Sequence, residues 1–124
     1  MNSDEDLRLA HHMADLAAEV SLRYLDLGGL RARTKQDGSP VTSADRRIER
    51  ELRALIDRMR PQDAFTGEEF GASGSGPRRW FVDAIDGTRS YLSGTPEWGT
   101  LIGLSHDGGT GLGLVCAPVL QRRW

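Results

Sequence analysis

The sequence predicts an α+β domain in which two amphipathic helices pack on a mainly antiparallel sheet. Apolar residues recur at helical spacing in two segments, residues 3–27 and 44–60. Short apolar or alternating runs, separated by Gly, Pro, Ser and Asp, dominate the chain after residue 64 and are typical of strands. The chain has 124 residues, which is the size of one domain with its own core.

The first predicted helix begins at Ser3 or Asp4, either of which can cap it, and ends near Leu27. The Gly28-Gly29 pair that follows supplies a left-handed stop. One apolar stripe runs along this helix and predicts the face that packs on the rest of the domain. The stripe consists of Leu9, Met13, Leu16, Val20, Tyr24 and Leu27.

The second predicted helix spans residues 44–60 and is preceded by a strand-like segment at 30–35 and a turn at 37–40. Thr42 or Ser43 can cap this helix, and Pro61 marks its end. Its expected buried stripe is formed by Ile48, Leu52, Leu55, Ile56 and Met59.

Strands are expected at 64–66, 80–82, 98–105 and 111–117. Residues 106–109 read as a hairpin connection, in which Asp107 is a turn residue and His106 is exposed. The Gly/Ser-rich segment 72–79 is expected to be a mobile surface loop. Residues 120–124 begin a further segment, and the edge of the last hairpin is expected to be exposed.

Composition excludes several classes of partner. The formal net charge of −2 favours neither nucleic acid nor an anionic membrane surface as a partner. No apolar run is long enough to span a membrane, and no apolar leader opens the chain. The single cysteine, Cys116, lies in an apolar run and predicts a buried structural thiol in a reducing compartment. We therefore expect a soluble, cytoplasmic protein.

The most informative stretch follows the apolar run Trp80-Phe81-Val82. Asp83 lies at the carboxyl end of that run, and Asp86 comes three residues later, just before Gly87-Thr88. Two carboxylates so close together favour a cation between them, and oxygen ligands suit Mg²⁺ or Mn²⁺ better than zinc. Free N–H groups at the following helix start would suit a phosphate. The alternative is an ordinary turn in which Asp caps a helix and Gly adopts a positive φ.

Three motifs taken together resemble the inositol monophosphatase family, whose members hydrolyse small phosphate monoesters with Mg²⁺. The first is Asp-Ala-Ile-Asp-Gly-Thr at 83–88, followed by Tyr91. The second is the acidic turn Gly-Glu-Glu at 67–69, and the third is the segment 35–45, from Lys35 to Asp45. The resemblance implies the amino-terminal part of the layered αβαβα sugar-phosphatase fold, and it covers nearly the whole chain.

The resemblance also implies a set of site residues. The expected Mg²⁺ ligands, with Mn²⁺ as the alternative ion, are Glu68, Asp83, Asp86 and the backbone carbonyl of Ile85, with Asp45 as an outer or additional ligand. Lys35 and Thr42 would lie nearby. Thr88, helped by Glu68, would orient the attacking water, and the N–H groups of Gly87 and Thr88 would hold the phosphate. From the residues alone, Asp45 is better explained as a first-turn residue that complements the helix dipole, and Glu68 is as consistent with a solvated acidic turn as with a metal ligand.

The chain departs from the family pattern in two respects. Family members are considerably longer, and their second half supplies a further aspartate in a Trp-Asp motif that is absent here. Residues 1–124 are therefore expected to be the amino-terminal domain of a truncated or split phosphatase, which would be a homodimer when complete. Ala84 stands where the family usually has proline, so the loop is expected to be less rigid without a change of chemistry.

The expected substrate is histidinol phosphate. Segments 71–80 and 88–104, together with the final Arg-Arg-Trp, look most like the histidinol-phosphate phosphatases of this family. Inositol 1-phosphate is the alternative substrate. A hypothesis from another class is an inactive fragment, or a subunit that requires a separate carboxyl-terminal partner.

Overall fold

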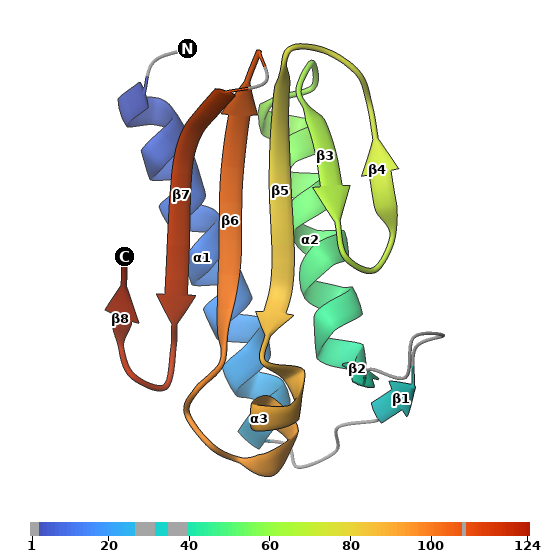
Figure 1. Cartoon of the computed structure of the whole chain (residues 1–124), viewed down its shortest axis with the longest axis vertical. Coiled ribbons are helices and arrows are strands. Elements are labelled where there is room, and N and C mark those ends of the chain that lie inside the picture. The colour runs from blue at the N-terminus through green and yellow to red at the C-terminus, as the bar shows by residue number, and fades with distance from the viewer. Residues whose placement is uncertain (1–2, 27–31, 35–39, 108) are drawn as a thin grey trace.

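The computed structural model describes residues 3–26, 32–34, 40–107 and 109–124. Two long helices, α1 (Ser3–Asp26) and α2 (Ser43–Met59), lie on one face of a six-stranded sheet (Figure 1). Neither long helix covers the opposite face of the sheet (Figure 1). The predicted architecture, two helices packed on a mainly antiparallel sheet, is confirmed.

Helix α1 begins at Ser3, as predicted, and has three acidic residues in its first turn that complement the helix dipole. Small and large apolar side chains alternate on its buried face, and the small ones allow close approach to α2 and the sheet. The buried apolar side chains are Leu9, Ala10, Met13, Ala14, Ala17 and Val20. The predicted end near Leu27 and the Gly28-Gly29 stop lie outside the described residues.

Helix α2 begins after Thr42, its N-cap, and ends at Met59, close to the predicted bounds. Its buried face contains Ala44, Asp45, Ile48, Glu49, Leu52, Leu55 and Ile56. Before it, β1 (Ala32–Thr34) and β2 (Pro40–Thr42) form a separate antiparallel pair. The predicted turn at 37–40 and Lys35 fall almost entirely outside the described residues.

The main sheet has the strand order β4-β3-β5-β6-β7-β8. Its strands are β3 (Ala64–Gly67), β4 (Gly71–Ser73), β5 (Arg78–Asp86), β6 (Gly99–His106), β7 (Gly109–Ala117) and β8 (Arg122–Arg123). β3 and β5 are parallel, and the other neighbouring strands are antiparallel. A short helix, α3 (Thr88–Ser93), connects β5 to β6 beyond one end of the sheet (Figure 1).

Three expectations about the strands need correction. The central strand does not end at Asp83 but continues to Asp86. The Gly/Ser-rich segment is not a loop throughout, because residues 71–73 form β4 and β5 already begins at Arg78. The hairpin edge is not fully exposed either, because β8 pairs with the last two residues of β7. In each case, pairing with a neighbouring strand outweighed the local composition.

The core lies between the helices and the sheet, and Trp80, Tyr91 and Phe65 are its largest fully buried side chains. Cys116 is a buried free thiol, as expected. On the opposite face of the sheet, Phe81 and Val115 remain 43% and 37% exposed. One face of the sheet is therefore packed, and the other presents apolar side chains to the solvent.

Candidate metal and phosphate site

The parallel pairing of β3 with β5 brings the first two predicted acids together. Gly67, the last residue of β3, pairs with Val82 of β5. Glu68 comes directly after Gly67, and Asp83 comes directly after Val82, so the two acids lie level with each other on neighbouring strands. Both acids line one hollow of about 750 Å³ on the open face of the sheet. Glu68 is exposed and Asp83 is partly buried. Two motifs that are fifteen positions apart in the sequence thus become neighbours through one strand pairing.

A β-bulge places Asp86 on the same face as Asp83. Asp83 pairs with Leu101 and Asp86 with Gly99, so three steps along β5 match two steps along β6. In a regular strand, residues three apart point to opposite faces. The extra residue cancels that change, and two successive residues, Ala84 and Ile85, are buried. Both aspartates therefore lie on the open face of the sheet.

The turn after β5 requires glycine and leads directly into α3. Gly87 has φ = 87°, and a Cβ at this position would lie 2.8 Å from the carbonyl oxygen of Glu97. Thr88 follows as the first residue of α3, and its Oγ1 donates a hydrogen bond to the Ile85 carbonyl at 3.1 Å. The predicted catalytic hydroxyl and the predicted carbonyl ligand are therefore in contact.

Tyr91 anchors α3 to the core. Its hydroxyl donates a hydrogen bond to the Ser21 carbonyl at 2.7 Å, and its ring meets Trp98 edge-on, with 4.7 Å between centroids. Burial raises the pKa of the Tyr91 hydroxyl above its ordinary value, and the charge of Asp45 adds to this shift. The charge of Asp45, at the start of α2, therefore acts on the Tyr91 hydroxyl.

Asp45 also forms a capping box. Its Oδ2 accepts hydrogen bonds from the Thr42 backbone N–H at 2.8 Å and from the Thr42 hydroxyl at 2.7 Å. The Asp45 N–H in turn donates to Thr42 Oγ1 at 3.2 Å. The side chain is only 3% exposed. The helix-start role suggested by the sequence is therefore present, and a role toward a cation would be additional to it.

Glu49 is a functional candidate that the sequence reasoning missed. Its fully buried carboxylate accepts hydrogen bonds from the backbone N–H groups of Glu69 and Phe70, directly after Glu68. The available signal was its position next to Ile48 and three residues before Leu52, within the buried face of α2. A charged residue on such a face needs a partner.

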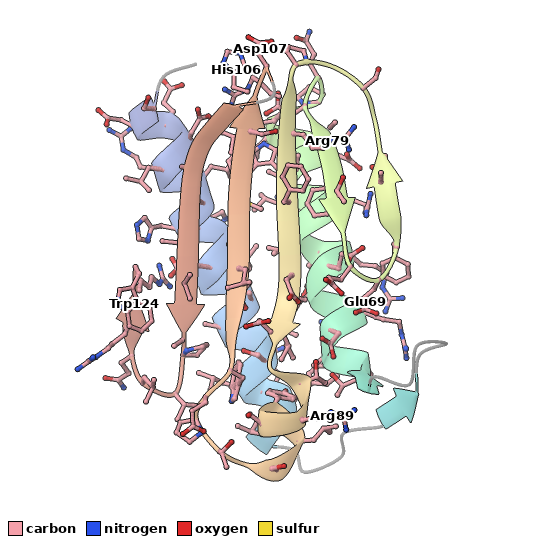
Figure 2. All side chains as sticks on the ribbon, in the orientation of Figure 1. Glu69, Arg79, Arg89, His106, Asp107 and Trp124 are labelled. Carbon is pink, nitrogen blue, oxygen red and sulfur yellow. The ribbon has the colours of Figure 1, made fainter. Side chains whose placement is uncertain are left out.

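The predicted site lies toward the end of the sheet where α3 is found. Figure 2 shows Glu69 on the turn beyond β3 and Arg89 on α3, whereas His106 and Asp107 lie at the far end of the sheet. Asp107 has φ = 53° and donates its N–H to the Pro77 carbonyl at 2.8 Å. Its predicted role as a turn residue is consistent with this position.

The donors fit a hard divalent cation by their chemistry. Glu68, Asp83, Asp86 and the Ile85 carbonyl offer only oxygen atoms, which suit Mg²⁺ or Mn²⁺. Within the described parts of the chain, no three acidic, histidine or cysteine side chains converge closely enough to hold one ion. The strand pairing and the bulge bring the acids to one region, and ion binding would require their side chains to turn toward one another.

Comparison with known proteins agrees with the resemblance seen in the motifs. The model of the inositol monophosphatase family matches residues 2–124. The chain belongs to the inositol monophosphatase family. Two curated relatives named histidinol-phosphatase, from Streptomyces coelicolor and Mycobacterium tuberculosis, are 47% and 46% identical over 97% and 98% of this chain. In each case the match covers 47% of the relative, so the chain spans about half the length of these relatives.

Solved structures share this fold. The extragenic suppressor protein suhB from Bartonella henselae matches with a TM-score of 0.90 at 24% identity, over 96% of this chain and 47% of that one. An inositol monophosphatase from Zymomonas mobilis matches with a TM-score of 0.75 at 36% identity, over 100% of this chain and 47% of that one. The expected amino-terminal part of the layered family fold is thus confirmed. None of the described helices has the length and apolarity needed to cross a bilayer.

Proposed function

We propose that this chain carries the metal-binding half of a phosphatase that hydrolyses a small phosphate monoester. The main supporting observation is the end of the β3–β5 pair, where a parallel register and a bulge bring Glu68, Asp83 and Asp86 to one face of the sheet. Thr88 follows within hydrogen-bonding distance of the Ile85 carbonyl. Membership of the family and this arrangement point to the same chemistry.

In this proposal, Glu68, Asp83, Asp86 and the Ile85 carbonyl hold Mg²⁺, with Mn²⁺ as the alternative, and Asp45 acts as an outer ligand. The bound cations would activate the attacking water and stabilise the leaving oxygen. Asp83 lies beside Glu68 through the β3–β5 pairing and three residues before Asp86, and it would be a ligand shared by two ions. The remaining steps belong to groups of the chain itself.

Thr88 is proposed to orient the attacking water through its hydroxyl, assisted by the Glu68 carboxylate. The contact between Thr88 Oγ1 and the Ile85 carbonyl keeps this hydroxyl next to a proposed cation ligand. The backbone N–H groups of Gly87 and Thr88 would donate to the phosphate oxygens, because the first N–H groups of a helix have no partner within it. The left-handed Gly87 sets the direction of those groups.

We propose histidinol phosphate as the substrate, because two relatives bearing the name histidinol-phosphatase are 46–47% identical to this chain. Inositol 1-phosphate is the second candidate, favoured by the 36% identity to the Zymomonas inositol monophosphatase. The test is phosphate release from each compound, with Mg²⁺ and then with a chelator. Chelator-sensitive release from histidinol phosphate at the higher rate supports the proposal, and preference for inositol 1-phosphate would replace the substrate.

We further propose that residues 1–124 form the amino-terminal domain of a longer enzyme. The support is the half-length match to the relatives and the open sheet face with exposed Phe81 and Val115. The reading frame after Trp124 tests this directly: an extension with a Trp-Asp motif supports it. A stop codon there, together with no phosphate release, would favour an inactive fragment, or a subunit that acts with a separate carboxyl-terminal partner.

A further inference from the structure

We infer that Glu49 is a positioning residue for the turn at residues 68–70, which carries the proposed ligand Glu68 and is called the metal-binding turn below. Through this turn, Glu49 sets the position of Glu68 relative to Asp83. The part of this inference that concerns the metal rests on the function proposed above. Glu49 lies in α2, on the packed side of the sheet, whereas Glu68 and Asp83 line the hollow on the open face. Glu49 therefore acts through the backbone of the turn.

The carboxylate of Glu49 holds the turn by two short hydrogen bonds. Its Oε1 accepts from the Glu69 N–H at 2.7 Å, and its Oε2 accepts from the Phe70 N–H at 2.8 Å. Both donors are backbone groups of the two residues that follow Glu68. Hydrogen bonds to an ionised acceptor are roughly twice as strong as neutral ones. Because Glu49 is 0% exposed, water does not compete for its carboxylate.

Gly67 makes this close approach possible. A Cβ on Gly67 would lie 2.1–2.4 Å from the carboxyl atoms of Glu49, which is far inside contact distance. The glycine of the Gly-Glu-Glu motif is therefore needed because the buried carboxylate occupies the space of a side chain. The motif and Glu49 form one unit, although eighteen positions separate Gly67 from Glu49.

Arg53 neutralises Glu49 and extends the same contact. Its NH2 group donates to Glu49 Oε2 at 3.1 Å and to the Gly71 carbonyl at 2.7 Å, and its NH1 group donates to Ser73 Oγ at 2.6 Å. The guanidinium also lies over the Phe65 ring, 4.5 Å from its centroid. One turn of α2 thus fixes both the metal-binding turn and the start of β4.

The position of Glu68 follows from this arrangement. Its side chain is exposed, and the position of that side chain depends on the backbone that carries it. That backbone is fixed on one side by the β3–β5 pairing at Gly67 and on the other by the bonds from Glu69 and Phe70 to Glu49. Partners of this kind, which orient a metal ligand without touching the metal, typically change metal affinity by about 10–100-fold when they are lost.

The test compares Glu49→Gln with Asp63→Asn in the full chain. Both changes convert a buried carboxylate to an amide. Asp63, however, lies directly before β3, whereas Glu49 binds the backbone of the turn that follows β3. Two quantities are measured: amide hydrogen exchange at Glu69 and Phe70, and the Kd for Mn²⁺ by titration. In Glu49→Gln, the amide nitrogen replaces one acceptor oxygen and cannot accept from a backbone N–H.

For Glu49→Gln we expect exchange at Glu69 and Phe70 to accelerate at least about tenfold and the Mn²⁺ Kd to rise at least about tenfold. Asp63→Asn should leave both values within about twofold of wild type even where it lowers the Tm. The inference would be overturned if the two amides of Glu49→Gln exchanged at the wild-type rate, or if both variants weakened Mn²⁺ binding equally.

If the wild type did not bind Mn²⁺, the proposed metal site would be overturned. The hydrogen-exchange measurement would still decide whether Glu49 orders the turn.

Should Glu49→Gln fail to fold, Gly67→Ala provides the second variant. Its methyl group would push the turn away from Glu49 while the buried carboxylate and its charge remain. We expect the same loss of amide protection and the same rise in Kd. Wild-type values for both measurements in Gly67→Ala would contradict the inference, because the contact that it describes would then have no effect on the site.

Discussion

The indole Nε1 of Trp80 donates a hydrogen bond to Asp63 Oδ2 at 2.9 Å, and both side chains are buried. Arg78, two residues before Trp80, donates Nε to both oxygens of the same carboxylate at 3.3 Å and donates NH2 to Asp6 Oδ1 at 2.6 Å. This network joins the start of α1, the segment before β3 and the start of β5. It fixes the end of the sheet that lies away from α3.

Replacement of Asp63 by alanine should destabilise the chain by about 3 kcal/mol, because it leaves the partly buried Arg78 charge and the buried Trp80 N–H without this acceptor. Urea unfolding measures the loss. Asp63→Asn keeps one oxygen for the indole and should cost less, so equal losses in the two variants would contradict this account of the network.

Asp83→Asn should abolish Mg²⁺-dependent phosphate release by the active form of the protein. The amide has no negative charge and only one oxygen, so it is a poor bridge between cations. The measurement is phosphate release from histidinol phosphate over a range of Mg²⁺ concentrations. Asp107→Asn, at the far end of the sheet, is the matched control and should retain wild-type activity. Appreciable activity in Asp83→Asn at saturating Mg²⁺ would remove Asp83 from the site.

Gly67→Ala and Glu49→Ala should show strong coupling in a double-mutant cycle. The alanine methyl at 67 clashes with the Glu49 carboxylate in the wild-type background, and the truncated side chain leaves space for it. We expect a coupling free energy of about 1–2 kcal/mol from urea unfolding of the two single variants and the double variant. Additive effects would mean that the turn moves away from α2 without cost.

Tyr91→Phe should remove part of the alkaline instability of the chain. Burial raises the pKa of the Tyr91 hydroxyl, so the folded state keeps a proton that the unfolded chain releases near the ordinary tyrosine pKa of about 10. The contribution of Tyr91 to stability is therefore complete below about pH 10 and decreases as the pH rises above it.

The measurement for Tyr91 is the free energy of unfolding at about pH 8 and about pH 11, below and above the ordinary tyrosine pKa. At the lower pH, Tyr91→Phe should be less stable by about 1 kcal/mol, because the Ser21 carbonyl loses its donor. Between the two pH values, the variant should lose less stability than the wild type. An equal loss in both proteins would mean that other groups cause the alkaline effect.

Ala84→Pro should tighten Mn²⁺ binding. Ala84 lies in the bulge between Asp83 and Asp86, a place in a sheet where proline is tolerated. A fixed φ at this position reduces the freedom of the unfolded chain, an effect of roughly 0.4–1 kcal/mol, and it should also stiffen the segment between the two ligands. A Kd equal to that of the wild type would show that alanine already holds this segment in place.

The helices and the family could be predicted from the sequence, because both depend on short-range patterns. The spacing of Leu52 and Ile56 indicates a helix, and the Asp83–Thr88 motif is typical of the family. The bulge could not be predicted, since it depends on how many residues of β6 lie opposite Asp83 and Asp86. Strand β4 was missed for the same reason: Gly71 and Ser73 have low strand propensity, and only pairing with β3 makes them a strand.

Glu49 was missed for a different reason. A glutamate on an amphipathic helix usually faces the solvent, and the partners that allow its burial come from residues 69 and 70, about twenty positions away. The residues around Glu49 in the sequence do not indicate that it binds the backbone of residues 69 and 70. The glycine at 67 held part of the information, because its lack of a side chain is explained only once the carboxylate beside it is known.

The bulge in β5 has a consequence for how the site can change. Three residue steps separate Asp83 from Asp86, so a regular ladder with the same spacing would direct Asp86 toward the helices. Deletion of one residue would also make the ladder regular, but the two aspartates would then be two residues apart and would still share a face. At the present spacing, Asp83 and Asp86 therefore share a face only while the bulge is kept. In any protein built on this frame with the same spacing, the bulge is as much a part of the site as the aspartates themselves.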